Sequence, residues 1–148
     1  MQLLTAALIT KVPTIVCEIN QPMNVDEFDV LNRSSLGMRR PVHDRECMQG
    51  MLDHGNLLVA ARSAGRLVGV SRSVTDFHFS CYLSNLAVDV AFQHQGIGKE
   101  LIRLTKAQLG KRCTLLLLSA PAAVAYYPHI AFEHHPQSWI LKPGTTVT

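Results

Sequence analysis

The fold is decided by residues 82–109, which read YLSNLAVDVAFQHQGIGKELIRLTKAQL. The first part, Tyr82–Val90, is apolar and rich in residues that favour β-structure, which predicts a buried strand. The second part carries an apolar stripe at helical spacing, formed by Ile97, Leu101, Leu104, Ile102 and Leu109. The stretch therefore predicts a strand that turns into an amphipathic helix.

Two glycines lie at this junction, within the heptapeptide Gln93-His94-Gln95-Gly96-Ile97-Gly98-Lys99. The first backbone N–H groups of a helix have no partner inside it, and the helix dipole makes that end positive. Glycine has no Cβ atom to hold a ligand away, so a phosphate group can sit directly on these amides. The pattern is thus consistent with an anion site, or with a plain loop-to-helix turn that uses glycine.

Two common phosphate-binding motifs do not fit this loop. A Walker loop needs glycine and Ser or Thr where Gln93 and Glu100 stand, and the dinucleotide fingerprint needs a third glycine where Leu101 stands. The remaining pattern, Gln-x-x-Gly-x-Gly, resembles the pyrophosphate loop of the GCN5-related N-acetyltransferase (GNAT) family. Members of that family hold acetyl-coenzyme A there.

Composition and charge exclude several other classes of protein. The chain has 148 residues, of which 47% are hydrophobic and 17% charged, which suits a single globular domain over residues 1–148. The net charge of +3 is too small to indicate nucleic-acid binding, and the longest basic run is Arg39-Arg40.

The cysteines and histidines indicate neither disulfides nor a metal site. Cysteines stand at positions 17, 47, 81 and 113 without a CxxC pair, which predicts free thiols and a cytoplasmic location. His134 and His135 are adjacent, and neighbours on a strand point to opposite faces, so they are poor joint ligands. The first nine residues lack a basic start and are too short to span a bilayer, so we interpret them as an extension or an extra first element, and expect no membrane partner.

The expected element order resembles the whole GNAT plan. It comprises a strand at 14–19, two helices with Asn24 or Asp26 and Asp44 as candidate caps, and two strands at 56–62 and 67–74 that precede the strand at about 82–90 and its helix. A parallel strand covered on both faces (about 113–118), a short helix (122–127) and a closing strand (138–141) follow. The resemblance implies an α/β (α+β) fold, with a mixed, mostly antiparallel sheet and helices on both faces. The sheet would be splayed between the strands at about 82–90 and 113–118.

The resemblance also implies which residues bind the cofactor. Backbone groups of Leu86, Ala87 and Val88 would bind the pantetheine arm. The pyrophosphate would lie on the amides of the glycine loop, with two side chains at its edge; the loop residues are Gln93, His94, Gln95, Gly96, Ile97, Gly98 and Lys99.

Tyr127 is the catalytic candidate that the resemblance implies, because the family usually has a tyrosine there. A phenol can hydrogen-bond to a thiolate sulfur and protonate it as it leaves. The alternative is an aromatic core residue, and Tyr126 is interpreted as its packing partner.

The chain departs from the family pattern at three places. Ala120 replaces a frequent asparagine, and Ala131 replaces a usual glycine, which predicts a slightly strained turn. The strand segment 81–88 carries no Asp or Glu, so the usual general-base position is empty. His78 is a possible base, although a solvated turn histidine is the alternative interpretation.

The function that the resemblance implies is direct acetyl transfer from acetyl-CoA to a primary amine of an unidentified acceptor, without metal. The alternative is a non-catalytic acyl-CoA-binding or regulatory protein. An acidic group near the first helix (Asp26, Glu27, Asp29) could attract a cationic amine or merely suit a helix N-terminus. The apolar run Trp139-Ile140-Leu141 indicates a possible homodimer.

Overall fold

The computed structural model describes residues 5–8 and 14–148. It contains two compact units, residues 1–118 and residues 119–148, which are described separately. The single domain over residues 1–148 stays a prediction.

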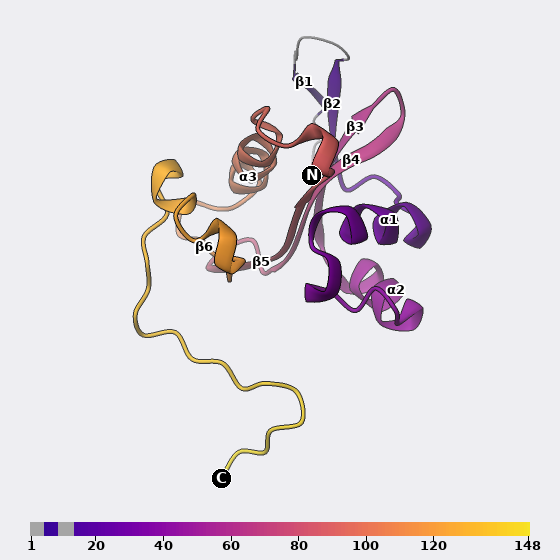
Figure 1. Cartoon of the computed structure of the whole chain (residues 1–148). Coiled ribbons are helices and arrows are strands. Elements are labelled where there is room, and N and C mark those ends of the chain that lie inside the picture. The colour runs from indigo at the N-terminus through magenta and orange to yellow at the C-terminus, as the bar shows by residue number, and fades with distance from the viewer. Residues whose placement is uncertain (1–4, 9–13) are drawn as a thin grey trace. The chain divides into compact units, whose positions relative to one another are not determined.

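The first unit is built on a six-stranded sheet in the order β1-β2-β3-β4-β5-β6 (Figure 1). All neighbours pair antiparallel except β5 and β6, which are parallel. The prediction of a mixed, mostly antiparallel sheet is confirmed. The strands are β1 (Thr5–Leu8), β2 (Ile15–Ile19), β3 (Leu57–Ser63), β4 (Arg66–Thr75), β5 (Ser80–Val88) and β6 (Thr114–Leu116).

The N-terminal extension contributes a strand of its own. β1 pairs with β2 from Thr5↔Glu18 to Leu8↔Ile15, so part of the extension is the extra first element. The rest of the prediction for the N-terminus, on residues 1–4 and 9–13, lies outside the described residues.

Helices cover both faces of the sheet, as predicted. They are α1 (Val25–Ser35) and α2 (Arg45–His54) on one face and α3 (Ile97–Ala107) on the other (Figure 1). One buried cluster joins α3 to the sheet, and a second joins α1 and α2 to its opposite face. Because the two clusters bury apolar side chains from alternate positions of the same strands, the sheet is fixed between its helices.

Local capping rules fix where the first two helices begin. The Glu27 amide donates to Asn24 Oδ1 (2.8 Å), which selects Asn24 over Asp26 as the cap of α1. The Cys47 amide donates to Asp44 Oδ1 (2.9 Å), which confirms Asp44 as the cap of α2. Both bonds satisfy a backbone donor that the helix itself leaves without a partner.

β5 and β6 pair only briefly and then separate. Their register runs from Ser80↔Thr114 to Tyr82↔Leu116, whereas β5 continues to Val88. The predicted splay between these strands is therefore present, and no described strand lies beside the backbone of β5 beyond Tyr82 on this side.

β6 itself differs from the prediction. The strand spans Thr114–Leu116 and not 113–118, and the predicted burial on both faces is wrong, because Leu116 and Leu118 are each 48% exposed. The continuous apolar composition indicated a strand covered on both faces, but β6 lies at the edge of the sheet, where cover from neighbouring elements is less complete.

The second unit has little regular structure. Two short 3-10 helices, η3 (Pro121–Ala123) and η4 (Tyr127–Ile130), replace the predicted helix at 122–127. The predicted closing strand at 138–141 is wrong, since the chain has no strand pairing there. Pro128 lies at the start of η4 and has no backbone N–H, so a single regular helix cannot run from η3 through η4.

Candidate functional site

The N-terminus of α3 presents free backbone amides. Gly96 immediately precedes the helix with φ +84°, a conformation that favours glycine, and no side chain caps this end. The first helical bond runs from the Glu100 amide to Gly96 O (3.1 Å). Within the described chain nothing accepts from the three preceding amides, those of Ile97, Gly98 and Lys99, so they can bind an anion.

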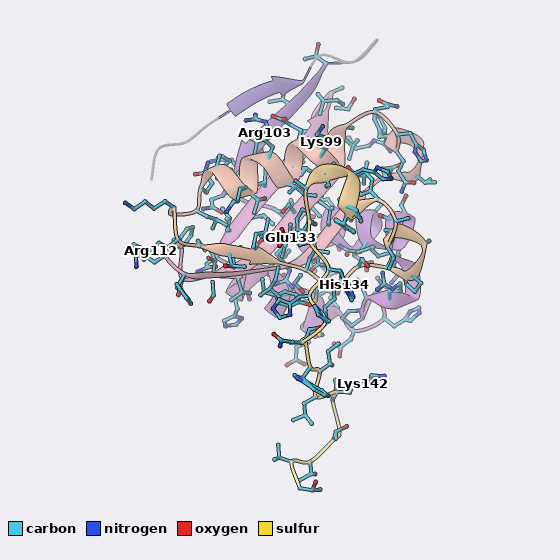
Figure 2. All side chains as sticks on the ribbon, turned by 90° about the vertical axis from the view of Figure 1, so that its left-hand side faces the viewer. Lys99, Arg103, Arg112, Glu133, His134 and Lys142 are labelled. Atoms are coloured by element: carbon cyan, nitrogen blue, oxygen red, sulfur yellow. The ribbon has the colours of Figure 1, made fainter. Side chains whose placement is uncertain are left out.

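The space in front of these amides is open. A Cβ atom at Gly96 would meet nothing within 4 Å, and one at Gly98 would meet only Val88 Cγ2 at 3.7 Å. Lys99 and Arg103 both project from α3 (Figure 2), but Arg103 is bound to Glu100 in an ion pair of 2.5 Å. Lys99 forms no ion pair with a described residue, so its charge supplements the helix dipole. This donor set fits a pyrophosphate group.

Gln93 and His94 lie in the loop before these amides. Gln93 Nε2 donates to Val88 O (3.0 Å), so the side chain ties the loop to the end of β5. His94 is exposed and has φ +63°, which places it in the left-handed region. The Gln93 side chain therefore anchors the loop to β5, whereas the His94 side chain is exposed on the surface of the loop.

β5 carries a bulge at the point where its outer edge becomes open. Arg72 pairs with Asn85 and Ser73 with Leu83, so Ser84 has no partner in β4. A bulge bends its strand and redirects backbone groups. Here it coincides with the end of pairing to β6, at Tyr82.

Most backbone groups on this open edge are already occupied. The Val88 amide donates to Ser35 Oγ (3.3 Å), and Arg40 Nη2 donates to Ser84 O (2.5 Å). Since alternate residues of a strand direct their backbone groups to the same side, Leu86 faces the open edge, whereas Ala87 faces β4. No described side chain bonds to the Leu86 backbone, so of the three residues predicted for pantetheine it offers both a free donor and a free acceptor.

A chain of buried polar side chains crosses the α1–α2 face of the sheet. Arg72 is 7% exposed, and its Nε donates to Asn85 Oδ1 (2.8 Å). Asn85 Nδ2 donates to Asn32 Oδ1 (3.1 Å), and Asn32 Nδ2 donates to Phe28 O (2.8 Å). Asn85 is fully buried and occupied, so it does not order a water for an acceptor amine.

The carboxylates near α1 are all used in ion pairs. Asp26 pairs with Arg45, Glu27 with Arg62, and Asp29 with Arg33. This pattern favours structural roles over the capture of a cationic amine.

His78 is an exposed turn residue. The Asp76 carboxylate accepts from the amides of Phe79, Ser80 and His78, which lower the pKa of Asp76 to about 2. The turn is therefore ordered by Asp76, and the structure shows the His78 imidazole on the surface.

In the second unit, Tyr127 belongs to a small aromatic cluster. Its ring lies edge-on to Tyr126 (5.4 Å between centroids) and to Phe132 (5.3 Å). Ala131 ends η4 with φ +74°, the conformation for which glycine is usual, and this agrees with the strained turn expected there. Ala120 precedes η3 and offers no polar side chain.

The described residues contain neither a cluster of metal ligands nor a membrane-spanning helix. No three His, Cys, Asp or Glu side chains gather there as metal ligands would. No helix in the described ranges is both long and apolar enough to cross a membrane. All four cysteines are free thiols.

Known sequences identify the family. The sequence model described as "Acetyltransferase (GNAT) domain" matches residues 34–146. The chain belongs to the GNAT acetyltransferase family. It is 32% identical over 74 residues to "Histone acetyltransferase TAP1" of Glycine max, and 31% identical over 74 residues to "GCN5-related N-acetyltransferase 2, chloroplastic" of Arabidopsis thaliana. These matches cover 49% of this chain and 32% and 29% of the relatives, so the chain matches about a third of their length.

Solved structures confirm the GNAT fold. A GNAT-family acetyltransferase from Streptococcus pneumoniae TIGR4 superposes with a TM-score of 0.70 at 21% identity, covering 86% of this chain and 98% of that one. An aminoglycoside N-acetyltransferase in complex with CoA gives 0.65 at 14% identity, covering 93% and 100%. A third, from an uncultured soil metagenomic sample and in complex with sisomicin, gives 0.64 at 19% identity, covering 90% and 97%.

The site contains residues that sequence reasoning missed. Ser34 and Ser35 end α1 and accept from the amides of Val90 and Val88, and Arg40 reaches the open edge of β5. All three are more than forty residues away from their partners in the sequence. A serine pair at a helix end and two adjacent arginines carry no local signal for such contacts.

Proposed function

We propose that this GNAT protein transfers an acetyl group from acetyl-CoA directly to a primary amine. The observation that carries the proposal is that two sets of unpaired backbone N–H and C=O groups occur in the same unit. These are the uncapped amides at the start of α3 and the open Leu86 backbone on β5. The first suits the pyrophosphate of the cofactor, and the second offers its carbonyl to the amide-containing arm and its N–H to the thioester.

The glycine loop would hold the cofactor by its phosphates. Amides from Gln95 to Lys99 would donate to the pyrophosphate, and Lys99 would add a charge at the rim. Gln93, bonded to Val88 O, keeps the loop in register with β5. Val88 contributes packing beside Gly98 while its own backbone amide is engaged by Ser35.

The chemistry would take place at the open edge of β5. The Leu86 amide would donate to the thioester oxygen and stabilise the charge that develops there when the amine attacks the carbonyl carbon. The new C–N bond forms, the C–S bond breaks, and the amine loses a proton to solvent because β5 has no Asp or Glu. Tyr127 would supply the proton that the leaving sulfur takes up.

A non-catalytic acyl-CoA-binding protein is the second candidate. The absence of an acidic side chain on β5 favours it, because no dedicated base would deprotonate the amine. Both candidates need the cofactor site, so acetyl-CoA binding alone does not separate them. Turnover does.

A screen of primary amines for release of free CoA tests the proposal. We expect at least one amine to release CoA thiol above the rate of acetyl-CoA hydrolysis without amine. Binding of acetyl-CoA with no release across amino acids, polyamines, aminoglycosides and lysine peptides would reject transfer and favour the second candidate.

The proposal also includes a cellular location and an oligomeric state. Free thiols at all four cysteines suit a reducing compartment, so a cytoplasmic location is part of the proposal. A homodimer is also part of it, because the side chains of the Trp139–Leu141 run are exposed. The acceptor amine stays unidentified at this level.

A further inference from the structure

Two arginines, the buried Arg72 and the half-buried Arg40, contact adjacent residues of β5 and have no acidic partner among the described residues. Arg72 is 7% exposed, and its bonds go to neutral acceptors, Asn85 Oδ1 (2.8 Å) and Met51 O (3.1 Å). Arg40 is half-buried, and its bonds go to Ser84 O (2.5 Å) and Arg39 O (2.8 Å). Neither guanidinium forms an ion pair with any described residue.

The other arginines of the described chain are either paired with a carboxylate or exposed to water. Five of them form ion pairs with carboxylates, and the remaining two, Arg39 and Arg112, are exposed to water. A charge in water needs no partner, whereas a buried charge costs free energy unless it is paired. The matched five are Arg33, Arg45, Arg62, Arg66 and Arg103.

The charge of Arg40 also acts on Arg72. Burial lowers the pKa of Arg72, and the nearby charge of Arg40 lowers it further. Burial likewise lowers the pKa of Arg40, with Arg39 adding to the effect. The phenol of Tyr82 opposes both shifts, so Tyr82 lies close to the pair. An anion between these groups would relieve a repulsion that the protein itself leaves in place.

Their position connects them to the acceptor. Arg40 binds the carbonyl of Ser84, two residues before Leu86 on the same open edge. Arg72 binds the side chain of Asn85, which lies between Ser84 and Leu86 in the sequence. Under the proposed function the reacting amine must approach this part of β5, so an anionic group on the same molecule would meet the arginines.

We propose that the acceptor is an anionic amine, which carries a carboxylate or phosphate that binds between Arg40 and Arg72. This inference rests on the proposed acetyl transfer and names the class of its substrate. It also separates this protein from the neighbour that was solved with sisomicin, because a polycationic amine would be repelled by the two guanidinium groups.

Matched ligand pairs test the inference on the whole protein. Calorimetry, with and without CoA, would compare amino acids with the amides of the same amino acids, and phosphoethanolamine with ethanolamine. We expect the anionic member of one pair to bind about tenfold or more tightly than its neutral partner, the usual effect of a hydrogen bond to a charged group. The pair that shows the difference identifies carboxylate or phosphate. Sisomicin should bind more weakly than either anionic ligand.

Arginine variants locate the effect. Arg40→Gln keeps a donor for Ser84 O but removes the charge, and should abolish the anionic preference, whereas Arg40→Lys should retain part of it. Arg112→Gln makes the same change in net charge at an exposed position and should retain the preference fully.

Three results would overturn the inference: equal binding within every pair, no binding of any anionic ligand, or a preference that survives in folded Arg40→Gln. Failure of the proposed function looks different. There, the anionic preference and its loss in Arg40→Gln would persist, but no amine would release CoA from acetyl-CoA.

Discussion

Gly69 of β4 lies directly against Leu101 of α3. A Cβ atom at position 69 would come within 3.1 Å of Leu101 Cδ1 and within 3.1 Å of Ile97 Cγ2. The glycine thus lets the helix pack close to the sheet. Because Ile97 is the first residue of α3, this contact also sets where the free amides of the helix lie relative to β5.

Gly69→Ala should destabilise the protein by about 1–3 kcal/mol, the usual cost of an extra methyl in a packed core. Denaturant unfolding measures it. Gly50→Ala is the matched control: it lies in α2, its Cβ would meet nothing within 4 Å, and it should be neutral or stabilising by up to about 1 kcal/mol. A folded Gly69→Ala variant as stable as wild type would show that the helix has room to move outward.

Ionisation of the Asp76 carboxyl should make the free energy of unfolding depend on pH in a narrow acidic range. Its pKa falls from 3.8 to about 2 on folding, so its stabilisation is present above pH 3.8 and is lost as the pH falls through about 2. Asp76→Asn should remove this part of the pH dependence in urea titrations between pH 5 and 2. Asp53→Asn, at a carboxylate that accepts from the Gln49 side chain and from no other described residue, serves as control. An unchanged profile in Asp76→Asn would contradict the assignment.

Tyr127 should act in the chemical step. Tyr127→Phe keeps the ring contacts with Tyr126 and Phe132 and removes the hydroxyl. We expect kcat to fall ~10²-fold, within the range of a positioned proton donor, with little change in the KM for acetyl-CoA. Tyr126→Phe is the control and should be nearly silent. Equal, small effects at both positions would reject Tyr127 as the acid.

The exposed apolar run of the second unit should mediate self-association. Trp139 is 94% exposed, and Ile140 and Leu141 are 63% and 60% exposed. Light scattering at micromolar concentration should give the mass of two chains for wild type and of one chain for Trp139→Ser. Val124→Ser, at a side chain 60% exposed in the same unit, should keep the dimer. A single-chain mass for wild type would end the proposal.

Local signals predicted the fold well because each depends on neighbours in the sequence. The caps Asn24 and Asp44 and the glycine junction at Gly96 are of this kind, since a few residues determine each of them. The closing strand at 138–141 failed for the opposite reason: apolar residues favour a strand, but a strand also needs a backbone to pair with.

The site was predictable only where it is built from contiguous residues. The loop from Gln93 to Lys99 could be read directly. The contacts of Arg40 with Ser84 and of Arg72 with Asn85 depend on which strands pair and on a bulge in β5. No sequence pattern predicts that bulge, so the contacts of the two arginines with β5 could be recognised only in the folded structure.

The central claim is that acetyl-CoA binds on the amides at the start of α3. Gly98→Glu tests it best, because Gly98 has an ordinary φ and room for a Cβ, whereas Gly96 has φ +84° and a substitution there would be strained. Gly50→Glu adds the same charge on α2 and serves as control. In calorimetry, acetyl-CoA should bind wild type and Gly50→Glu alike and show no measurable binding to folded Gly98→Glu. Unchanged affinity in folded Gly98→Glu would contradict the account.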